Sequence, residues 1–233
     1  MKKIERKQID ALYDFTRQHY VEHYDLQTEL VDHLANDIEQ IWEKNPNLSF
    51  EDARDRSFKK FGVFGFMDVV EKRQKAMNKK YFKYLKNELI QWFGWPKLLT
   101  TLLMFIICYI GFSSNYVSQF FLSVYLPLSI WLIYRGIVLA KALKKRKSSS
   151  NKKWMLEEMI FKQAGFMGLI LISQLPTYSV HIGDRITNPF FVLLFSLTTT
   201  ILILCFYISY NVIPKKADTL LKDTYPEYKS AIL

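Results

Sequence analysis

The feature that most constrains this chain is the uneven distribution of its charges. From Met1 to about Lys80 a charged residue recurs every few positions, whereas long stretches between Trp92 and Ile213 carry almost none. A soluble globular chain spreads its apolar residues at the period of a helix or a strand. Segregation on this scale indicates instead that the chain passes from water into lipid. We therefore expect an all-α protein, in which a small cytosolic helical bundle precedes an α-helical membrane domain.

Residues 1–76 have the pattern of a compact helical bundle. Apolar residues at helical spacing predict one helix over about residues 3–20 and a second over about residues 26–43, with Asp25 as the N-cap of the second. Ser49 is a good N-cap for a third helix.

The end of the bundle and the start of the membrane domain are also marked in the sequence. Gly62 is a good stop for the third helix. A fourth helix is expected from Phe66 to about Trp92. Residues 77–97 would then form a basic linker helix that enters the membrane.

Four apolar segments define a predicted four-helix transmembrane domain over residues 98–213. They are approximately residues 95–112, 117–140, 155–180 and 189–213. The third is the weakest, because its uncharged part is shorter than the ~20 residues that cross a ~30 Å hydrocarbon core. It can cross if Lys162 snorkels to the interface; otherwise it lies along the inner surface as an amphipathic helix. Residues 214–233 would form a cytosolic C-terminal tail.

The basic residues predict the orientation. The formal net charge is +10, and the excess of Lys and Arg lies within residues 79–97, 141–153 and 215–216, whereas the predicted outer connections carry only Arg185. Basic residues concentrate on the cytoplasmic side of a membrane, so both termini are expected in the cytoplasm. Residues 1–76 hold slightly more acidic than basic residues, which argues against nucleic acid as a partner. Anionic lipid headgroups are the expected partners of the basic segments.

A sequence pattern between residues 20 and 65 resembles a known family of modules. It consists of Glu29-Leu30-x-x-His33-Leu34, then Ser49-x-Glu51-x-Ala53, then Phe61-Gly62. It resembles HAAS-type signalling domains and permease prefix domains, which precede transmembrane segments in many bacterial membrane proteins. The resemblance implies a protein of the bacterial cytoplasmic (inner) membrane with a cytosolic N-terminal module. That module would bind a protein partner or a second copy of the chain.

His33 is a candidate switch or interaction residue within this pattern. Glu29 lies four residues before it and Asp37 four residues after it, so the three side chains share one helix face. One interpretation is a solvated or half-buried histidine that fixes a helix contact. The other is a pH-sensitive or metal-sensitive switch, because nearby carboxylates favour the imidazolium. A lone histidine lacks the paired nitrogen or sulfur ligands of most zinc sites, so no metal site is expected.

Ionisable residues within the apolar segments form a candidate intramembrane polar site. Arg135 lies late in the second segment, and Glu157, Glu158 and Lys162 lie early in the third. Such residues are functional candidates by default. They could form a polar pocket for a headgroup, an ion or a partner subunit, or only snorkel and form a local ion pair.

A run of basic residues follows the second segment. Lys144, Lys145, Arg146 and Lys147 precede three serines that would give a flexible loop. The run fits contact with anionic lipid headgroups, and it fits equally well a topology signal with no further role.

The sequence carries none of the common catalytic motifs. It has no GxSxG elbow, no HExxH, no P-loop and no glycine-rich dinucleotide turn, and its two cysteines lie within apolar runs. We expect no catalytic residue and no cofactor. The expected function is a non-enzymatic membrane protein whose cytosolic domain mediates protein–protein interaction or signal relay. The alternatives are an accessory subunit of a transport or secretion complex, and a small lipid-handling enzyme that uses Glu157 or Glu158.

Overall fold

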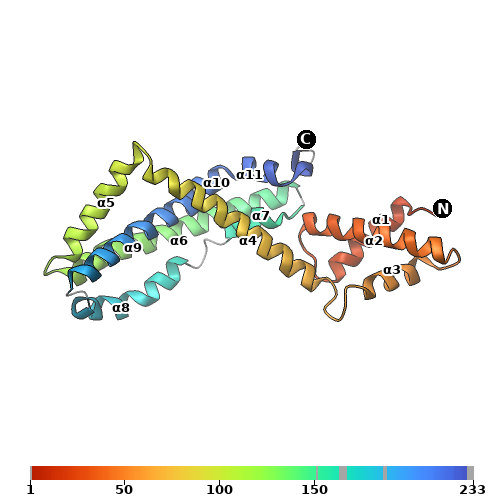
Figure 1. Ribbon diagram of the computed structural model, residues 1–233, viewed down its shortest axis with the longest axis horizontal. Helices are drawn as coiled ribbons and strands as arrows, with labels where there is room; N and C mark the ends of the chain where they lie inside the picture. The colour runs from red at the N-terminus through yellow and green to blue at the C-terminus, as the bar shows by residue number, and fades with distance from the viewer. Residues whose placement is uncertain (1, 151, 163–166, 186–187, 230–233) are drawn as a thin grey trace. The chain divides into compact units, whose positions relative to one another are not determined.

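The computed structural model describes residues 2–150, 152–162, 167–185 and 188–229. Every regular element within these residues is helical, which confirms the all-α class (Figure 1). The chain divides into two compact units. Unit 1 comprises Met1–Lys79 and Ser150–Leu156, and unit 2 comprises Lys80–Ser149 and Glu157–Leu233.

Unit 1 is a bundle built around the second of its helices. It contains α1 (Arg6–Gln18), α2 (Tyr24–Lys44), α3 (Phe50–Lys59) and the first half of α4 (Met67–Ile90). Apolar residues of α2 recur at intervals of three and four, which places them on one buried face. The buried core of the bundle consists of Leu12, Phe15, Leu26, Leu30, Leu34, Ile38, Trp42, Ala53 and Phe66.

Two of the predicted helix ends of unit 1 are confirmed and one is wrong. Ser49 caps α3, because its hydroxyl oxygen accepts a hydrogen bond from the backbone N–H of Asp52 at 3.0 Å. Gly62 follows α3 with a φ of 79°, a left-handed conformation that glycine adopts without strain. Asp25 is not the N-cap of α2, because the helix begins at Tyr24 with His23 as its cap. The Asp25 carboxylate instead accepts a hydrogen bond from the distant Met155 N–H.

Unit 2 begins in the second half of α4 and contains the apolar helices. In chain order its further elements are η1 (Gln91–Phe93), α5 (Lys97–Phe112), α6 (Val117–Ser150), α7 (Met155–Lys162), α8 (Met167–Arg185), α9 (Pro189–Tyr207), the π-helix η2 (Ile208–Val212), α10 (Ile213–Lys215), α11 (Ala217–Thr224) and η3 (Pro226–Lys229). Figure 1 shows α6 and α9 running side by side. A hydrogen bond of 2.9 Å between the Tyr125 and Thr199 hydroxyls joins these two helices. Aromatic side chains fill the space between α5, α6 and α9, where Phe112 packs against Phe120 and Phe195.

Two helices in the described part of the chain are long and apolar enough to cross a membrane. They span Val117–Ser148 and Pro189–Lys215. A third crossing is possible where α4 and α5 are taken together, although these two helices are bent by 87° at the break between them. The helix α8 as described does not reach the same length and apolarity. Its Arg185 side chain lies outside the described residues.

One expectation for the segment around the basic run needs correction. Residues 141–153 were expected as a basic loop, but α6 continues through the first part of them to Ser150. Lys, Arg, Ala and Leu are strong helix formers, and Leu139 and Leu143 continue the buried face of α6 one turn apart. The third apolar segment is described as two helices, α7 and α8, and residues 163–166 between them lie outside the described part.

Candidate functional site

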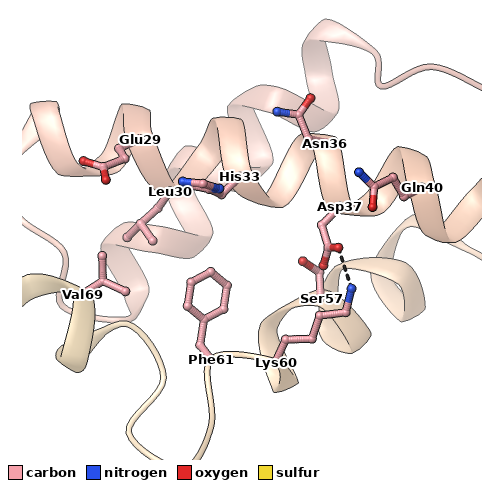
Figure 2. Close-up of a pocket in the computed structure, with 10 residues that line it drawn as sticks. All are labelled: Glu29, Leu30, His33, Asn36, Asp37, Gln40, Ser57, Lys60, Phe61 and Val69. Carbon is pink, nitrogen blue, oxygen red and sulfur yellow. Dashed lines mark hydrogen bonds and ion pairs between the residues drawn. The ribbon is translucent and has the colours of Figure 1, made fainter.

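A pocket of about 380 Å³ opens on unit 1 between α2, α3 and the start of α4. Residues of α2 at intervals of three and four face it, because that spacing places them on one side of the helix. Its lining consists of Glu29, Leu30, His33, Asn36, Asp37, Gln40, Ser57, Lys60, Phe61 and Val69, as Figure 2 shows. All three predicted switch residues, Glu29, His33 and Asp37, therefore lie at one pocket.

Part of the pocket lining is apolar. Leu30 and Val69 contribute aliphatic surface, and Figure 2 shows the Phe61 ring to the right of both. The Phe61 ring also packs against the buried Phe66, with ring centroids 4.9 Å apart. A small apolar base with a polar rim is the usual composition of a binding pocket.

The polar rim includes an ion pair that the sequence does not reveal. Lys60 Nζ lies 2.5 Å from Asp37 Oδ1 and joins the end of α3 to α2 (Figure 2). Partial burial alone would raise the pKa of the Asp37 carboxyl, but hydrogen bonds from Lys60 and Ser57 outweigh it and hold that pKa below its usual value.

The structure gives the carboxylates near His33 cationic partners of their own. Glu29 Oε2 lies 3.5 Å from Arg73 Nη1, and Asp37 pairs with Lys60. His33 lies between Glu29 and Asp37 on α2, and its side chain lines the same pocket and is exposed (Figure 2).

A buried charge lies at the start of α2, where sequence reasoning placed only a helix cap. The Asp25 side chain is 3% exposed, and its Oδ1 accepts the backbone N–H of Met155 at 3.2 Å. Its other oxygen lies 3.7 Å from Arg73 Nε. Arg73 thus lies between the carboxylates of Asp25 and Glu29, and it links α4 to α2.

The start of α2 also holds the segment Lys152–Leu156, which we call the return segment. The Tyr24 N–H donates to the Lys153 carbonyl at 2.7 Å, and Lys153 Nζ lies 2.8 Å from Glu22 Oε2. Trp154 is 1% exposed and packs edge-on against the Tyr24 ring at 5.4 Å. No local sequence pattern could have revealed these contacts, because the partners are about 130 residues apart.

In unit 2 the predicted intramembrane polar site is divided between two places. Arg135 Nη2 donates to the Tyr210 carbonyl at 2.8 Å, within the π-helix η2. This hydrogen bond joins α6 to the π-helix that follows α9.

The two glutamates of α7 pair with the basic end of α6. Glu157 is 3% exposed and accepts from Arg146 Nε at 2.6 Å. Glu158 contacts Lys147 at 3.1 Å and Lys162 at 2.8 Å. The structure thus brings together two sets of residues that the sequence placed in different sites.

These charged side chains of α6 and α7 form one ionic cluster, and Arg146 makes the most contacts described for it. Its Nη2 also contacts the Asp218 carboxylate of α11 and donates to the Tyr228 hydroxyl at 2.9 Å. The hydrogen bond from Arg146 lowers the pKa of Asp218 below its usual value. Arg146 and Lys147, predicted as lipid contacts, hold carboxylates, whereas the side chains of Lys144 and Lys145 are exposed.

The chemistry available at these places is ionic and structural. The cluster consists of paired charges, and the pocket of unit 1 has a carboxylate–ammonium pair on its rim. Among the described residues, no three or more His, Cys, Asp or Glu side chains lie together where they could hold a metal ion. Comparison with protein-family models, curated proteins and solved structures found no match to this chain, so the resemblance of residues 20–65 to HAAS-type and permease prefix domains rests on the quoted positions alone.

Proposed function

We propose that the chain is a non-enzymatic integral membrane protein of the bacterial cytoplasmic membrane, with four crossings by α5, α6, α8 and α9. The length and apolarity of α6 and α9 support the proposal, as does the packing of α5 against α9. The concentration of Lys and Arg before α5, at the end of α6 and after α9 favours cytoplasmic termini.

Reporter fusions to the full chain test this topology. A periplasm-active reporter inserted after Asn115 or Asn188 should be active, and one inserted after Ser148 or at Tyr225 should be silent. A silent reporter at Asn188, with an active one at Asn115, would show that the third apolar segment lies along the inner surface. That result would reduce the number of crossings and move the C-terminus outside.

We further propose that unit 1 binds a protein partner and relays that binding to the membrane helices. The observation that carries the relay is the attachment of the return segment to the start of α2, through Tyr24, Asp25 and Trp154. Residues 152–154 of the return segment lie in the connection between α6 and α7. A partner that moves the start of α2 would therefore also move the return segment, and through it the connection between α6 and α7.

The pocket of unit 1 is the proposed partner site, and its variants test it. His33→Glu and Val69→Glu add charge to the pocket and should abolish co-purification of a partner with the full chain in mild detergent. Tyr20→Asn is a matched control, because Tyr20 is 83% exposed and has a φ of 63°, which Asn tolerates. Equal recovery of the partner with all three variants would contradict a role for the pocket.

The same experiment separates the proposal from its main alternative. An accessory subunit of a transport complex would retain a permease or ATPase partner through its membrane helices. Recovery of such a partner in constant ratio, unaffected by His33→Glu or by removal of residues 1–76, would favour the accessory subunit over the relay.

A further inference from the structure

The second half of α4 has a packed side and an exposed side. One side packs within unit 2: Tyr81 is 4% exposed, the Tyr84 hydroxyl lies 3.4 Å from Thr224 Oγ1, and Glu88 accepts from Lys216 Nζ at 2.6 Å. These contacts attach the helix to α11 and to the end of α10. The other side of the helix is exposed.

The exposed side carries large apolar side chains. Phe82, Lys86 and Ile90 follow one another at intervals of four and so form a single stripe. Phe82 is 59% exposed and Ile90 57% exposed. Phe93 and Trp95 extend the apolar surface beyond the helix, and both are exposed.

Lysines lie among these apolar residues, and the free charge on the exposed side has one sign. Lys83, two turns before Ile90, lies on the same side of the helix as Ile90, whereas Asn87 lies about 140° around the helix from Phe82. Glu88 is the only acidic residue between Glu71 and Glu157, and it pairs with Lys216. An apolar stripe bordered by lysines is typical of helices that lie in a membrane interface, where the lysine stems extend to the headgroups.

The bend between α4 and α5 gives the second half of α4 a direction that fits a helix in the membrane interface. The two helices are bent by 87°, so if α5 crosses the membrane, the helix before it runs close to the membrane plane (Figure 1). Contacts on both sides fix the corner. Thr101 Oγ1 donates to the Trp92 carbonyl at 2.9 Å, and the Trp92 ring packs against Tyr207.

We propose that residues 80–93 form an interfacial helix that lies flat in the cytoplasmic leaflet and binds anionic lipid. Phe82 and Ile90 enter the boundary between headgroups and acyl chains, while Lys83 and Lys86 bind phosphate groups. The sequence had suggested that the linker enters the membrane directly. In this proposal the linker lies on the bilayer surface instead. The inference rests on the proposed insertion of α5.

Site-directed spin labels on the full chain test the inference. The chain, with Cys108→Ala and Cys205→Ala, is reconstituted in nanodiscs of phosphatidylcholine and phosphatidylglycerol. Labels at Phe82→Cys and Ile90→Cys should collide with oxygen several-fold more than with a water-soluble nickel complex. Asn87→Cys is the matched control at the edge of the exposed side that lies farthest from Phe82, and its label should prefer the nickel complex. Leu102→Cys in α5 reports membrane insertion.

The Leu102 label distinguishes failure of the interfacial helix from failure of the proposed insertion of α5. If that label lies in the acyl region while Phe82 and Ile90 are as accessible to nickel as Asn87, the interfacial helix is overturned and insertion stands. A Leu102 label exposed to water overturns both. Nanodiscs of phosphatidylcholine alone should lower the oxygen preference at Phe82, and an unchanged preference would contradict the role of anionic lipid.

A second measurement does not require removal of the native cysteines. A photoreactive phenylalanine analogue is placed at position 82 or 87 of the otherwise unchanged chain in the same nanodiscs. Lipid adducts identified by mass spectrometry at Phe82 and not at Asn87 are the expected result. Equal lipid labelling at the two positions, or none at Phe82, would overturn the proposal.

Discussion

Arg146 links three acidic or phenolic side chains, and its removal should be severe. Glu157 is buried, so Arg146→Gln leaves a buried carboxylate without its guanidinium and is expected to cost about 3–5 kcal/mol. The double variant Arg146→Gln/Glu157→Gln should cost less, because no uncompensated charge remains. Thermal unfolding of the full chain in mild detergent, followed by circular dichroism, measures both. Lys144→Gln, at an exposed position, is the control.

The pair between Asp37 and Lys60 makes a prediction about pH. The folded pKa of Asp37 lies below its ordinary value, so the pair stabilises the fold above about pH 3.9 and this contribution is lost as pH falls through the folded pKa. The pair is partly exposed, so it contributes no more than about 1 kcal/mol. Lys60→Met should raise the pKa of Asp37, as measured from its carboxyl carbon chemical shift. An unchanged pKa in this variant would show that Lys60 is not the cause.

The N-terminus of α3 is stabilised by a single side-chain cap, Ser49. The Ser49 hydroxyl satisfies one N–H at its first turn, so Ser49→Ala should cost about 1 kcal/mol. Hydrogen exchange of α3 amides in the full chain should accelerate roughly fivefold, while exchange in α9 should stay unchanged. Equal acceleration in both helices would indicate global destabilisation rather than loss of the cap.

The helices differ in how well the sequence predicts them, for physical reasons. Local patterns sufficed where local interactions decide the structure, as at Ser49 and Gly62 and along the apolar face of α2. They failed at Asp25, whose partner Met155 is distant in sequence. A cap residue and a buried tertiary acceptor have the same sequence signature, and only the fold distinguishes them.

The continuation of α6 through its basic end was missed for a different reason. The lysines and serines suggested a solvated loop, although Leu139 and Leu143 already kept the helical spacing of the buried face. The hydrogen-bond partners of Arg146 come from α7, α11 and η3. Such pairings depend on which helices meet, so the sequence could propose the charged residues of the site but not their partners.

On the scale of the molecule, the two compact units do not coincide with two continuous stretches of sequence. Unit 1 includes the return segment, which lies between helices of the other unit along the chain. A fully buried tryptophan holds this segment, together with a backbone hydrogen bond at Tyr24. Trp154, which lies in the connection between α6 and α7, is therefore part of the core of unit 1.

This connection can be broken without touching an apolar helix. Trp154→Ala removes a fully buried side chain and should cost about 3–5 kcal/mol within unit 1. Because the Tyr24 N–H bonds to Lys153, its exchange with solvent should accelerate strongly in the full chain, whereas the amides of α9 should keep their protection. Phe64→Ala, at a residue 71% exposed, is the control and should leave both unchanged. Unaltered exchange at Tyr24 in Trp154→Ala would mean that the return segment is not held by this contact, and the relay would lose its physical basis.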